Sequence, residues 1–330
     1  MRLQAPGFWW RLPDRPGILP RVLAPLGWIY AAATARRLRQ PGYRSQVPVI
    51  CIGNLVAGGA GKTPTVICLI ERLTARGHAV QVVSRGYGGT LAGPVRVGAS
   101  HLAAEVGDEP LLLSAFAPVW ISRDRAAGVR AAQAAGARVI LLDDGFQSPS
   151  VVPTLALVVV DAAKGFGNDR CIPAGPLREP VAVGLARADL VLTIGNGAAQ
   201  ARFDTVWGGA VPVPRLRGEL MPLQMGMEWR GQRVLAFAGI ADPGRFFTSL
   251  AAEGAVLVRG EALGDHEVLS ETLLRRLEAE AFAVGAQLVT TEKDAARLPV
   301  AWRTKVLTLV VRLQVKDWSV LDAAFDRLGL

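Results

Sequence analysis

The stretch VPVICIGNLVAGGAGKTPT, residues 47–65, combines a short apolar run, a glycine-rich loop and Lys62-Thr63-Pro64. The β-branched residues of Val47–Ile52 predict a buried parallel strand, and the apolar periodicity after Pro64 predicts a helix. Glycines let backbone N–H groups surround an anion, and the helix N-terminus adds a positive dipole end. The order of strand, glycine loop, Lys-Thr and helix is therefore typical of a phosphate-binding P-loop.

This loop departs from the pattern G-x-x-x-x-G-K-[ST] at one position, where Val56 replaces glycine. The other interpretation is a glycine-rich turn before a helix with a chance Gly-Lys-Thr. The flanking strand and helix favour the phosphate site. Lys62 is then expected to reach the β- and γ-phosphates, and the Thr63 hydroxyl to bind Mg²⁺. The predicted nucleotide-binding residues are Gly58, Gly59, Ala60, Gly61, Lys62, Thr63 and Pro64.

Composition limits the partners that this chain can have. Its 330 residues are 51% hydrophobic, which is enough for two domains with a sizeable core. The net charge of +9 indicates an anionic partner, such as a nucleotide, a phospholipid surface or a nucleic acid. Because no basic run is interleaved with aromatics, we expect no nucleic acid. No obligate protein partner is evident either. The three cysteines have no metal-binding spacing, which fits a reducing compartment.

Residues 1–46 differ in composition from the rest of the chain. Aromatic residues and arginines flank an apolar stretch, Val22–Ala35, which contains Pro25 and Gly27. The stretch is shorter than the ~20 apolar residues that a membrane span needs. Aromatics and arginines around a short apolar helix are typical of a segment lying in a membrane interface. The alternative is an ordinary amphipathic helix packed on the domain.

After the P-loop, predicted strands alternate with predicted helices. This alternation predicts an α/β fold with a P-loop NTPase-like, three-layer parallel sheet over residues 47–200. The pattern restarts in a smaller α/β domain over residues 201–330, which can return its last strands or helix to the core. Within it, residues 202–232 are expected to form short strands and turns, and Val306–Val311 the last strand.

Two further stretches carry polar groups for chemistry. Asp143-Asp144 directly follows the apolar strand Val139–Leu142, where a P-loop enzyme holds Mg²⁺ opposite its Lys-Thr. An aspartate after a strand is also a common turn residue or helix cap, and the P-loop favours the metal interpretation. The segment Lys164–Pro180 has almost no periodicity, and such a long loop in a compact domain is often functional. The alternative is a solvated connection.

The chain resembles the tetraacyldisaccharide 4′-kinases, the lipid A 4′-kinase family, in motifs spread from about Leu23 to Leu298. DDGFQ together with PAGPLREP is the most specific of these. Ala60 and Glu267 depart from the residues usual in the family. The motifs, in chain order, are GNLVAGGAGKTP (53–64), SRGYGG (84–89), VGDEP (106–110), LLDDGFQ (141–147), GNDRCIPAGPLREP (167–180), FAGIADPGRFF (237–247), DH (265–266) and TTEKDAARL (290–298).

The resemblance implies a membrane enzyme that uses ATP and Mg²⁺. The family transfers the γ-phosphate of ATP to the 4′-hydroxyl of a tetraacylated glucosamine disaccharide 1-phosphate, at the cytoplasmic face of the bacterial inner membrane. Asp108 matches the family's general base and His266 the residue that orients it. Arg125 matches a phosphate-contacting arginine. The remaining matches are the metal and active-site acids Asp143 and Asp144, and the substrate-contacting residues Arg85, Asn168, Arg178 and Glu179.

Two other functions stay open from the residues alone. A P-loop GTPase or metal-insertion chaperone would need a guanine-reading Asn/Thr-Lys-x-Asp motif, to which residues 290–294 (TTEKD) come close. A nucleotide-gated membrane adaptor would keep Lys62 but would need no carboxylate base.

Overall fold

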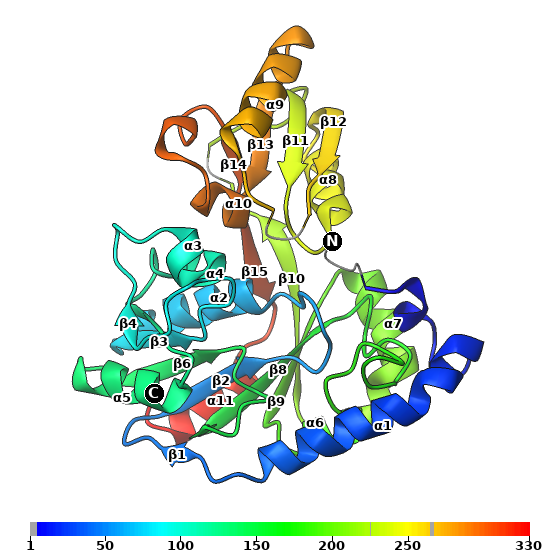
Figure 1. Ribbon diagram of the computed structural model, residues 1–330, viewed down its shortest axis with the longest axis vertical. Coiled ribbons are helices and arrows are strands. Elements are labelled where there is room, and N and C mark those ends of the chain that lie inside the picture. The colour runs from blue at the N-terminus through cyan, green and yellow to red at the C-terminus, as the bar shows by residue number, and fades with distance from the viewer. Residues whose placement is uncertain (1–4, 225, 265–266) are drawn as a thin grey trace.

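The computed structural model describes residues 5–224, 226–264 and 267–330. Within these ranges the strands form a nine-stranded sheet, a four-stranded sheet and a two-stranded sheet made of β1 (Tyr43–Arg44) and β7 (Val151–Val152). We call the part built on the nine-stranded sheet the large lobe and the part built on the four-stranded sheet the small lobe (Figure 1).

The strand order of the large sheet is β15-β10-β9-β8-β2-β6-β3-β5-β4. Every pair from β10 to β5 is parallel, and only the edge strands β15 and β4 pair antiparallel. The carboxyl ends of the parallel strands therefore meet along one edge, where such sheets carry their ligands. The strands are β2 (Val49–Gly53), β3 (Val80–Ser84), β4 (Val95–Arg96), β5 (Val119–Ile121), β6 (Val139–Asp143), β8 (Leu155–Asp161), β9 (Leu190–Ile194), β10 (Arg215–Pro222) and β15 (Val311–Val315).

Helices cover both faces of this sheet. One core joins the sheet to α2 (Lys62–Ala75), α4 (Asp108–Leu113) and α11 (Ser319–Arg327). The other core joins it to α5 (Arg125–Ala134), α6 (Val181–Leu185) and α7 (Gly197–Trp207). Strands β2, β3, β6, β8 and β9 are buried along their whole length, because helices pack on both sides. The predicted three-layer, P-loop NTPase-like fold is confirmed.

The small lobe is a second parallel sheet with its own helices. Its order is β12-β11-β13-β14. Helices α8, α9 and α10 begin after Asp242, Ser270 and Thr291, whose side chains accept N–H groups of the first turn. The elements are β11 (Arg233–Ala238), α8 (Pro243–Ala252), β12 (Val256–Ala262), α9 (Glu271–Ala283), β13 (Gln287–Thr291), α10 (Glu292–Ala296) and β14 (Leu307–Leu309).

An antiparallel pair, β10 and β15, belongs to the large sheet and leads to the small lobe (Figure 1). Two predictions about this region were wrong. Residues 202–232 begin inside helix α7, which Asn196 caps by accepting the N–H of Ala199. Residues 306–311 do not form a single last strand, because β14 ends at Leu309 in the small sheet and β15 starts at Val311 in the large one. The division at residue 200 stays a prediction.

The N-terminal segment forms a longer helix than its apolar stretch predicts. Helix α1 runs over Ile18–Leu38 without a break at Pro25. Its 21 residues extend about 31 Å at 1.5 Å per residue, which is enough by length and composition to cross a membrane. The expectation that this segment is too short to span was therefore wrong. Arginine favours the helical conformation, so the helix continues through Arg36 and Arg37 beyond the apolar stretch.

The remaining described elements are short. They are the 3₁₀ helices η1 (Gly7–Trp10), η2 (Gly208–Ala210) and η3 (Val300–Trp302), and the helix α3 (Ala103–Val106).

Candidate functional site

The P-loop joins β2 to α2 at the carboxyl edge of the large sheet. Gly61 has a left-handed φ of +87°, and a Cβ there would lie 2.6 Å from Ile194 Cδ1. Only glycine fits both the conformation and the space. Lys62 is the first residue of α2, so the positive end of this helix faces the loop. This geometry fits an anion held by the loop.

Asp144 is the meeting point of two cationic side chains. Lys62 Nζ lies 3.6 Å from Asp144 Oδ1, and Arg178 Nη1 donates to the same oxygen at 3.0 Å. Burial favours the neutral acid, but Lys62 and Arg178 outweigh it and hold the pKa of Asp144 below its usual value. Asp144 has φ +51°, and Arg125 Nη2 donates to its carbonyl oxygen at 2.8 Å, which holds this backbone conformation.

Asp143 has the opposite electrostatic environment. It is almost completely buried at the end of β6, and Ser84 Oγ donates to its Oδ2 at 3.0 Å. Burial, followed by the nearby negative charges of Glu109 and Asp144, raises the pKa of Asp143 to about 7. Two adjacent carboxylates thus have their pKa values moved in opposite directions, as acids with different roles often do.

The Asp143 carboxylate fits a divalent cation. Its Oδ1 is buried and, in the part of the chain that the structure describes, has no hydrogen-bond partner. Such an oxygen gains strongly from a cation. Mg²⁺ prefers oxygen ligands and commonly takes one or two carboxylates together with substrate phosphates. Among the described residues no cluster of three or more His, Cys, Asp or Glu surrounds a common point, so a cation at Asp143 would need phosphate oxygens or water as its other ligands.

A cavity of about 280 Å³ opens between the two lobes directly above the P-loop. Its floor is Gly59–Pro64, and its other wall comes from the small lobe. Sequence analysis did not assign these small-lobe residues, although the motifs FAGIADPGRFF and TTEKDAARL contain most of them. Apolar walls beside a phosphate-binding loop suit a nucleotide with its base and ribose between the lobes. The small-lobe lining includes Ile240, Ala241, Asp242, Arg245, Phe246, Thr291, Glu292 and Lys293.

Ion pairs cross from one lobe to the other around this cavity. Lys164 lies 3.3 Å from Asp242, and Asp161 lies 3.3 Å from Arg245. On the side of α4, Glu109 faces Lys293 at 3.5 Å. These pairs hold the small lobe over the P-loop.

The predicted base, Asp108, is also at this boundary. It is the first residue of α4, and its Oδ2 lies 3.5 Å from Arg297 Nε of the small lobe. The predicted partner of the base, His266, lies outside the described residues. The flanking residues Gly264 and Glu267 are described, and Glu267 Oε2 accepts the N–H of Gly264 at 2.6 Å.

The predicted substrate residues fall into two groups. Arg178 belongs to the site, because its Nη1 donates a hydrogen bond to Asp144 Oδ1. Glu179 is buried behind it, where it pairs with Arg187 at 2.6 Å and accepts from Gln147 at 3.0 Å. Gln147 Oε1 in turn accepts from Arg178 at 3.2 Å. Arg178, Glu179 and the DDGFQ motif are thus parts of one polar network.

The other predicted residues lie at the edges of this network. Asn168 is buried and donates to the carbonyl oxygens of Phe8 and Ala174, so its hydrogen bonds connect the Lys164–Pro180 loop to the N-terminal segment. Arg85 is exposed just beyond β3. Arg125 is buried behind Asp144. Substrate or phosphate contact by Arg85, Arg125 and Asn168 stays a prediction.

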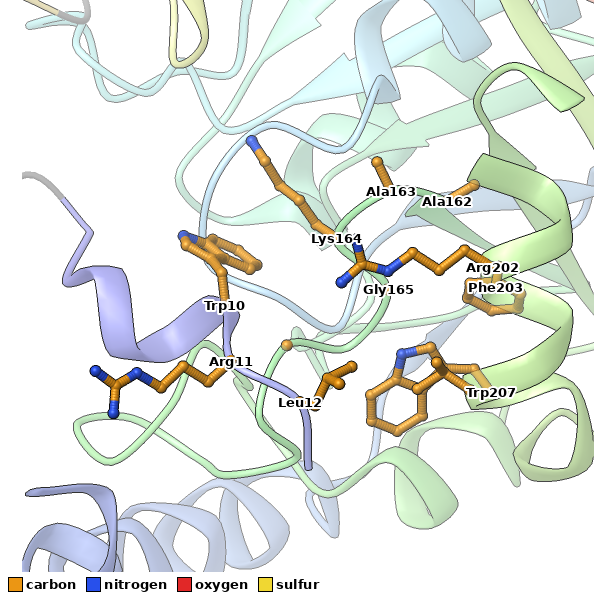
Figure 2. Close-up of a pocket in the computed structure, with 12 residues that line it drawn as sticks. Trp10, Arg11, Leu12, Ala162, Ala163, Lys164, Gly165, Arg202, Phe203 and Trp207 are labelled. Carbon is orange, nitrogen blue, oxygen red and sulfur yellow. The ribbon is translucent and has the colours of Figure 1, made fainter. Parts of the chain in front are cut away.

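A second cavity, of about 220 Å³, lies between η1, the loop after β8 and α7 (Figure 2). Lys164 lines this cavity as well as the interlobe one, with its Nζ 5.5 Å from the centre of the Trp10 ring. Arg202 and Trp207 of α7 complete the far wall. Sequence analysis gave no role to these residues.

Comparisons with known proteins agree with one another. Residues 19–328 match the family model described as tetraacyldisaccharide-1-P 4′-kinase. The tetraacyldisaccharide 4′-kinase of Dinoroseobacter shibae is 61% identical over 99% of this chain and 98% of its own length. That of Jannaschia sp. strain CCS1 is 56% identical over 99% of both chains.

A solved structure has the same fold along the chain. It is "apo" form LpxK from Aquifex aeolicus in complex with ATP, which is 25% identical with a TM-score of 0.77 and covers 95% of this chain and 100% of its own. Since both the sequence and the structural matches extend over nearly the whole length, the chain belongs to the tetraacyldisaccharide 4′-kinase family.

Proposed function

We propose that this chain transfers the γ-phosphate of ATP to the 4′-hydroxyl of a tetraacyl glucosamine disaccharide 1-phosphate, a step of lipid A biosynthesis. It is a phosphotransferase with an alcohol acceptor. The single observation that carries the proposal is the convergence of Lys62 and Arg178 on Asp144, because Lys62 also lines the floor of the interlobe cavity. Family membership supplies the identity of the acceptor.

The charges in the cavity support a division of roles. Lys62 and the P-loop N–H groups from Gly58 to Thr63 hold the β- and γ-phosphates of ATP. Arg178, which contacts the same oxygen of Asp144, stabilises the charge that spreads over the transferred group. Asp144 lies between the two cations and keeps both oriented in the absence of phosphate. Arg125 acts through Asp144 by fixing its backbone.

Asp143 and Thr63 are the residues that we assign to Mg²⁺. When bound, it would neutralise charge on the phosphate oxygens during transfer. Asp143 would be its carboxylate ligand, because its inner oxygen is buried without a partner among the described residues. Ser84 would hold the other oxygen of that carboxylate in place.

Asp108 is the group that we assign to accept the proton of the 4′-hydroxyl. It lies at the lobe boundary, so the approach of the small lobe would bring helix α10, which contains Asp294, and the flanks Gly264 and Glu267 of the segment 264–267 toward it. Closure of the lobes excludes water, which limits wasteful hydrolysis of ATP. His266, in that segment, stays the proposed orienting partner.

Helix α1 is the proposed membrane contact, at the cytoplasmic face of the bacterial inner membrane. One side packs on the large lobe, since a Cβ at Gly27 would lie 2.9 Å from the carbonyl oxygen of Cys171. The opposite side is apolar and exposed, at Ile18, Val22, Leu26 and Ile29. A helix that packs with one side and exposes an apolar other side fits insertion in the interface, and arginines near its ends fit an anionic surface.

The GTPase alternative loses its main support at Asp294. This carboxylate is fully buried, accepts the N–H of Gly239 and the hydroxyl of Thr291, and pairs with Arg297. It is therefore occupied by the protein and does not face the cavity as a guanine-reading aspartate would.

Nucleotide consumption with and without the lipid acceptor tests the proposal. We expect ATP turnover that depends on the tetraacyldisaccharide 1-phosphate, with GTP a poor substitute. Turnover of GTP in preference to ATP, independent of the lipid, would favour the GTPase alternative. Binding of nucleotide with no turnover of either would favour the adaptor.

A further inference from the structure

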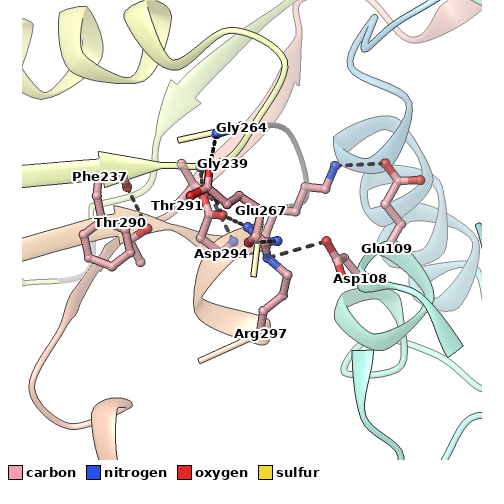
Figure 3. A network of polar contacts seen from close by, with 11 residues as sticks. Asp108, Glu109, Phe237, Gly239, Gly264, Glu267, Thr290, Thr291, Asp294 and Arg297 are labelled. Atoms are coloured by element: carbon pink, nitrogen blue, oxygen red, sulfur yellow. Dashed lines mark hydrogen bonds and ion pairs between the residues drawn. The ribbon is translucent and has the colours of Figure 1, made fainter. Parts of the chain in front are cut away.

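Arg297 crosses the lobe boundary to reach the predicted base. It follows α10 in the small lobe, and its side chain is only 7% exposed. Its Nε lies 3.5 Å from Asp108 Oδ2, at the start of α4 in the large lobe (Figure 3). A buried guanidinium attracts a neighbouring carboxylate strongly and can fix the direction in which its oxygens point.

The small lobe holds this guanidinium by its other nitrogens. Arg297 Nη2 pairs with Asp294, and Nη1 donates to the carbonyl oxygen of Glu267 at 2.9 Å. Asp294 is itself fixed, because it accepts the N–H of Gly239 at 3.1 Å and the hydroxyl of Thr291 at 2.7 Å. Figure 3 shows these groups gathered around Asp294. The network leaves the guanidinium little freedom and directs its Nε toward Asp108.

One donor in this arrangement is unused. Arg297 Nε is buried and has no hydrogen-bond partner among the residues that the structure describes. At 3.5 Å its contact with Asp108 is an ion pair that is too long for a good hydrogen bond. Leaving a buried charged donor unsatisfied is costly. An approach of the lobes by roughly half an ångström would satisfy it at ordinary N–H···O distance.

A second pair on the same helices has the same spacing. Lys293, four residues before Arg297, lies 3.5 Å from Glu109, the residue after Asp108. Two consecutive acids of α4 thus face two basic residues at ion-pair distance. A single small movement of α10 toward α4 would shorten both contacts together.

We propose that Arg297 is a positioning residue for Asp108, and that lobe closure completes a charge-assisted hydrogen bond between them. The bond orients the carboxylate toward the acceptor hydroxyl only when the small lobe covers the nucleotide. Through its hydrogen bond to the Glu267 carbonyl oxygen, the same side chain connects the base to Glu267 of the small lobe. The inference rests on the proposed function, since it requires Asp108 to be the base.

The geometry requires arginine at this position. The planar guanidinium faces Asp294, Glu267 and Asp108 with three different nitrogens, whereas a lysine ammonium is a single point charge. Gly239 is required beside it, because a Cβ there would lie 2.7 Å from Arg297 Nη2 and 3.1 Å from Asp294 Oδ1. Gly239→Ala therefore keeps the guanidinium but displaces it.

The test compares Arg297→Ala, Arg297→Lys and Gly239→Ala in the full-length enzyme, with ATP and tetraacyldisaccharide 1-phosphate as substrates. Arg233→Ala is the matched control, because Arg233 is in the same lobe and its guanidinium donates to the carbonyl oxygen of Val284 without reaching the large lobe. We expect Arg297→Ala to lower kcat by about 10- to 100-fold, as small misplacements of catalytic groups do. The Kd of ATP should change less than twofold.

Arg297→Lys should recover only part of kcat, and Gly239→Ala should lower it with ATP binding intact. In the Asp108→Ala background, Arg297→Ala should cause no further loss, because there is no carboxylate left to position. Melting temperatures with and without ATP show whether a variant has lost its fold. If Arg297→Ala has, the kcat of Gly239→Ala decides whether the position of the guanidinium matters for transfer.

The inference is overturned if Arg297→Ala behaves like Arg233→Ala, or if its loss adds fully to that of Asp108→Ala. An Asp108→Ala enzyme with normal kcat would instead contradict the proposed base. A wild-type enzyme that transfers no phosphate to the lipid would contradict the proposed function itself.

Discussion

Lys62 Nζ, from the floor of the interlobe cavity, lies 3.6 Å from Asp144 Oδ1. The lysine belongs to the first turn of α2, which follows β2 and the P-loop. The aspartate directly follows β6, the neighbour of β2 in the sheet. Since β2 and β6 are parallel neighbours, their carboxyl ends bring these two motifs together. The pair prepares a site in which a phosphate can replace the carboxylate as the partner of Lys62.

Lys62→Ala should remove most of the transfer activity, because a charge-assisted phosphate contact is lost. We expect kcat to fall by about 10²–10³-fold, similar to the loss of one preorganised donor. Steady-state phosphorylation of the lipid acceptor measures it. Lys164→Ala is a useful comparison, since Lys164 lines the same cavity but pairs with Asp242 at its rim. A Lys62→Ala enzyme of near-normal rate would contradict the kinase assignment.

Asp143 should make the metal-free protein less stable as the pH rises. Its folded-state pKa is raised to about 7, so the folded protein binds this proton more tightly than the unfolded chain does. The contribution of Asp143 to stability is therefore complete below the ordinary carboxyl pKa of about 4 and is lost as the pH rises through about 7.

Asp143→Asn removes this titration with little change of shape. In buffer with a chelator, the variant should melt at a higher temperature than the wild type at pH 8, and the difference should shrink toward pH 5. Added Mg²⁺ should reduce the difference at pH 8, because the cation favours the ionised carboxylate. A difference that is constant across this pH range would show that the Asp143 proton is not the cause.

Sequence patterns predicted the structure best where a motif directly adjoins the strand or helix that positions it. The P-loop and the strand before Asp143 lie in elements predicted from neighbouring residues alone. The pattern could not show that Val311–Val315 leaves the small sheet for the large one, because strand pairing depends on residues far apart in the chain. It also missed helix α7, which begins at an asparagine cap between glycines.

The candidate site was predictable only as separate groups. Lys62, Asp143 and Asp144 follow from their positions at strand ends. Arg297 does not, since nothing local in TTEKDAARL indicates that its guanidinium reaches Asp108 in the other lobe. Asn168 and Glu179 came from a resemblance of motifs. The structure adds that both are buried and already hydrogen-bonded within the protein.

The exposed side of α1 should determine membrane binding. Ile18, Val22 and Ile29 are 80%, 68% and 67% exposed on this helix. Val22→Glu with Ile29→Glu should move the protein from the vesicle-bound to the free fraction, with anionic phospholipid vesicles and flotation as the measurement. The control is Phe282→Glu, since Phe282 is 89% exposed but lies on α9 of the small lobe. Equal binding of both variants would place the membrane contact elsewhere.

Asp108→Ala should lower kcat more than it affects ATP binding. A general base acts in the transfer step, and its loss costs about 10²–10⁴-fold in rate. His266→Ala should have a smaller effect, and the double variant should be no slower than Asp108→Ala. Losses that add fully would mean that His266 acts independently of Asp108. An unchanged kcat in Asp108→Ala would move the base role to Asp143 or Asp144.

The most direct measurement follows the phosphate itself. Purified enzyme is incubated with ATP labelled in the γ-phosphate and either tetraacyldisaccharide 1-phosphate or its 4′-deoxy analogue, and the label in the lipid is counted. The account predicts label in the acceptor that has a 4′-hydroxyl and none in the 4′-deoxy analogue. Equal labelling of both lipids, or release of labelled phosphate with no labelled lipid, would contradict it.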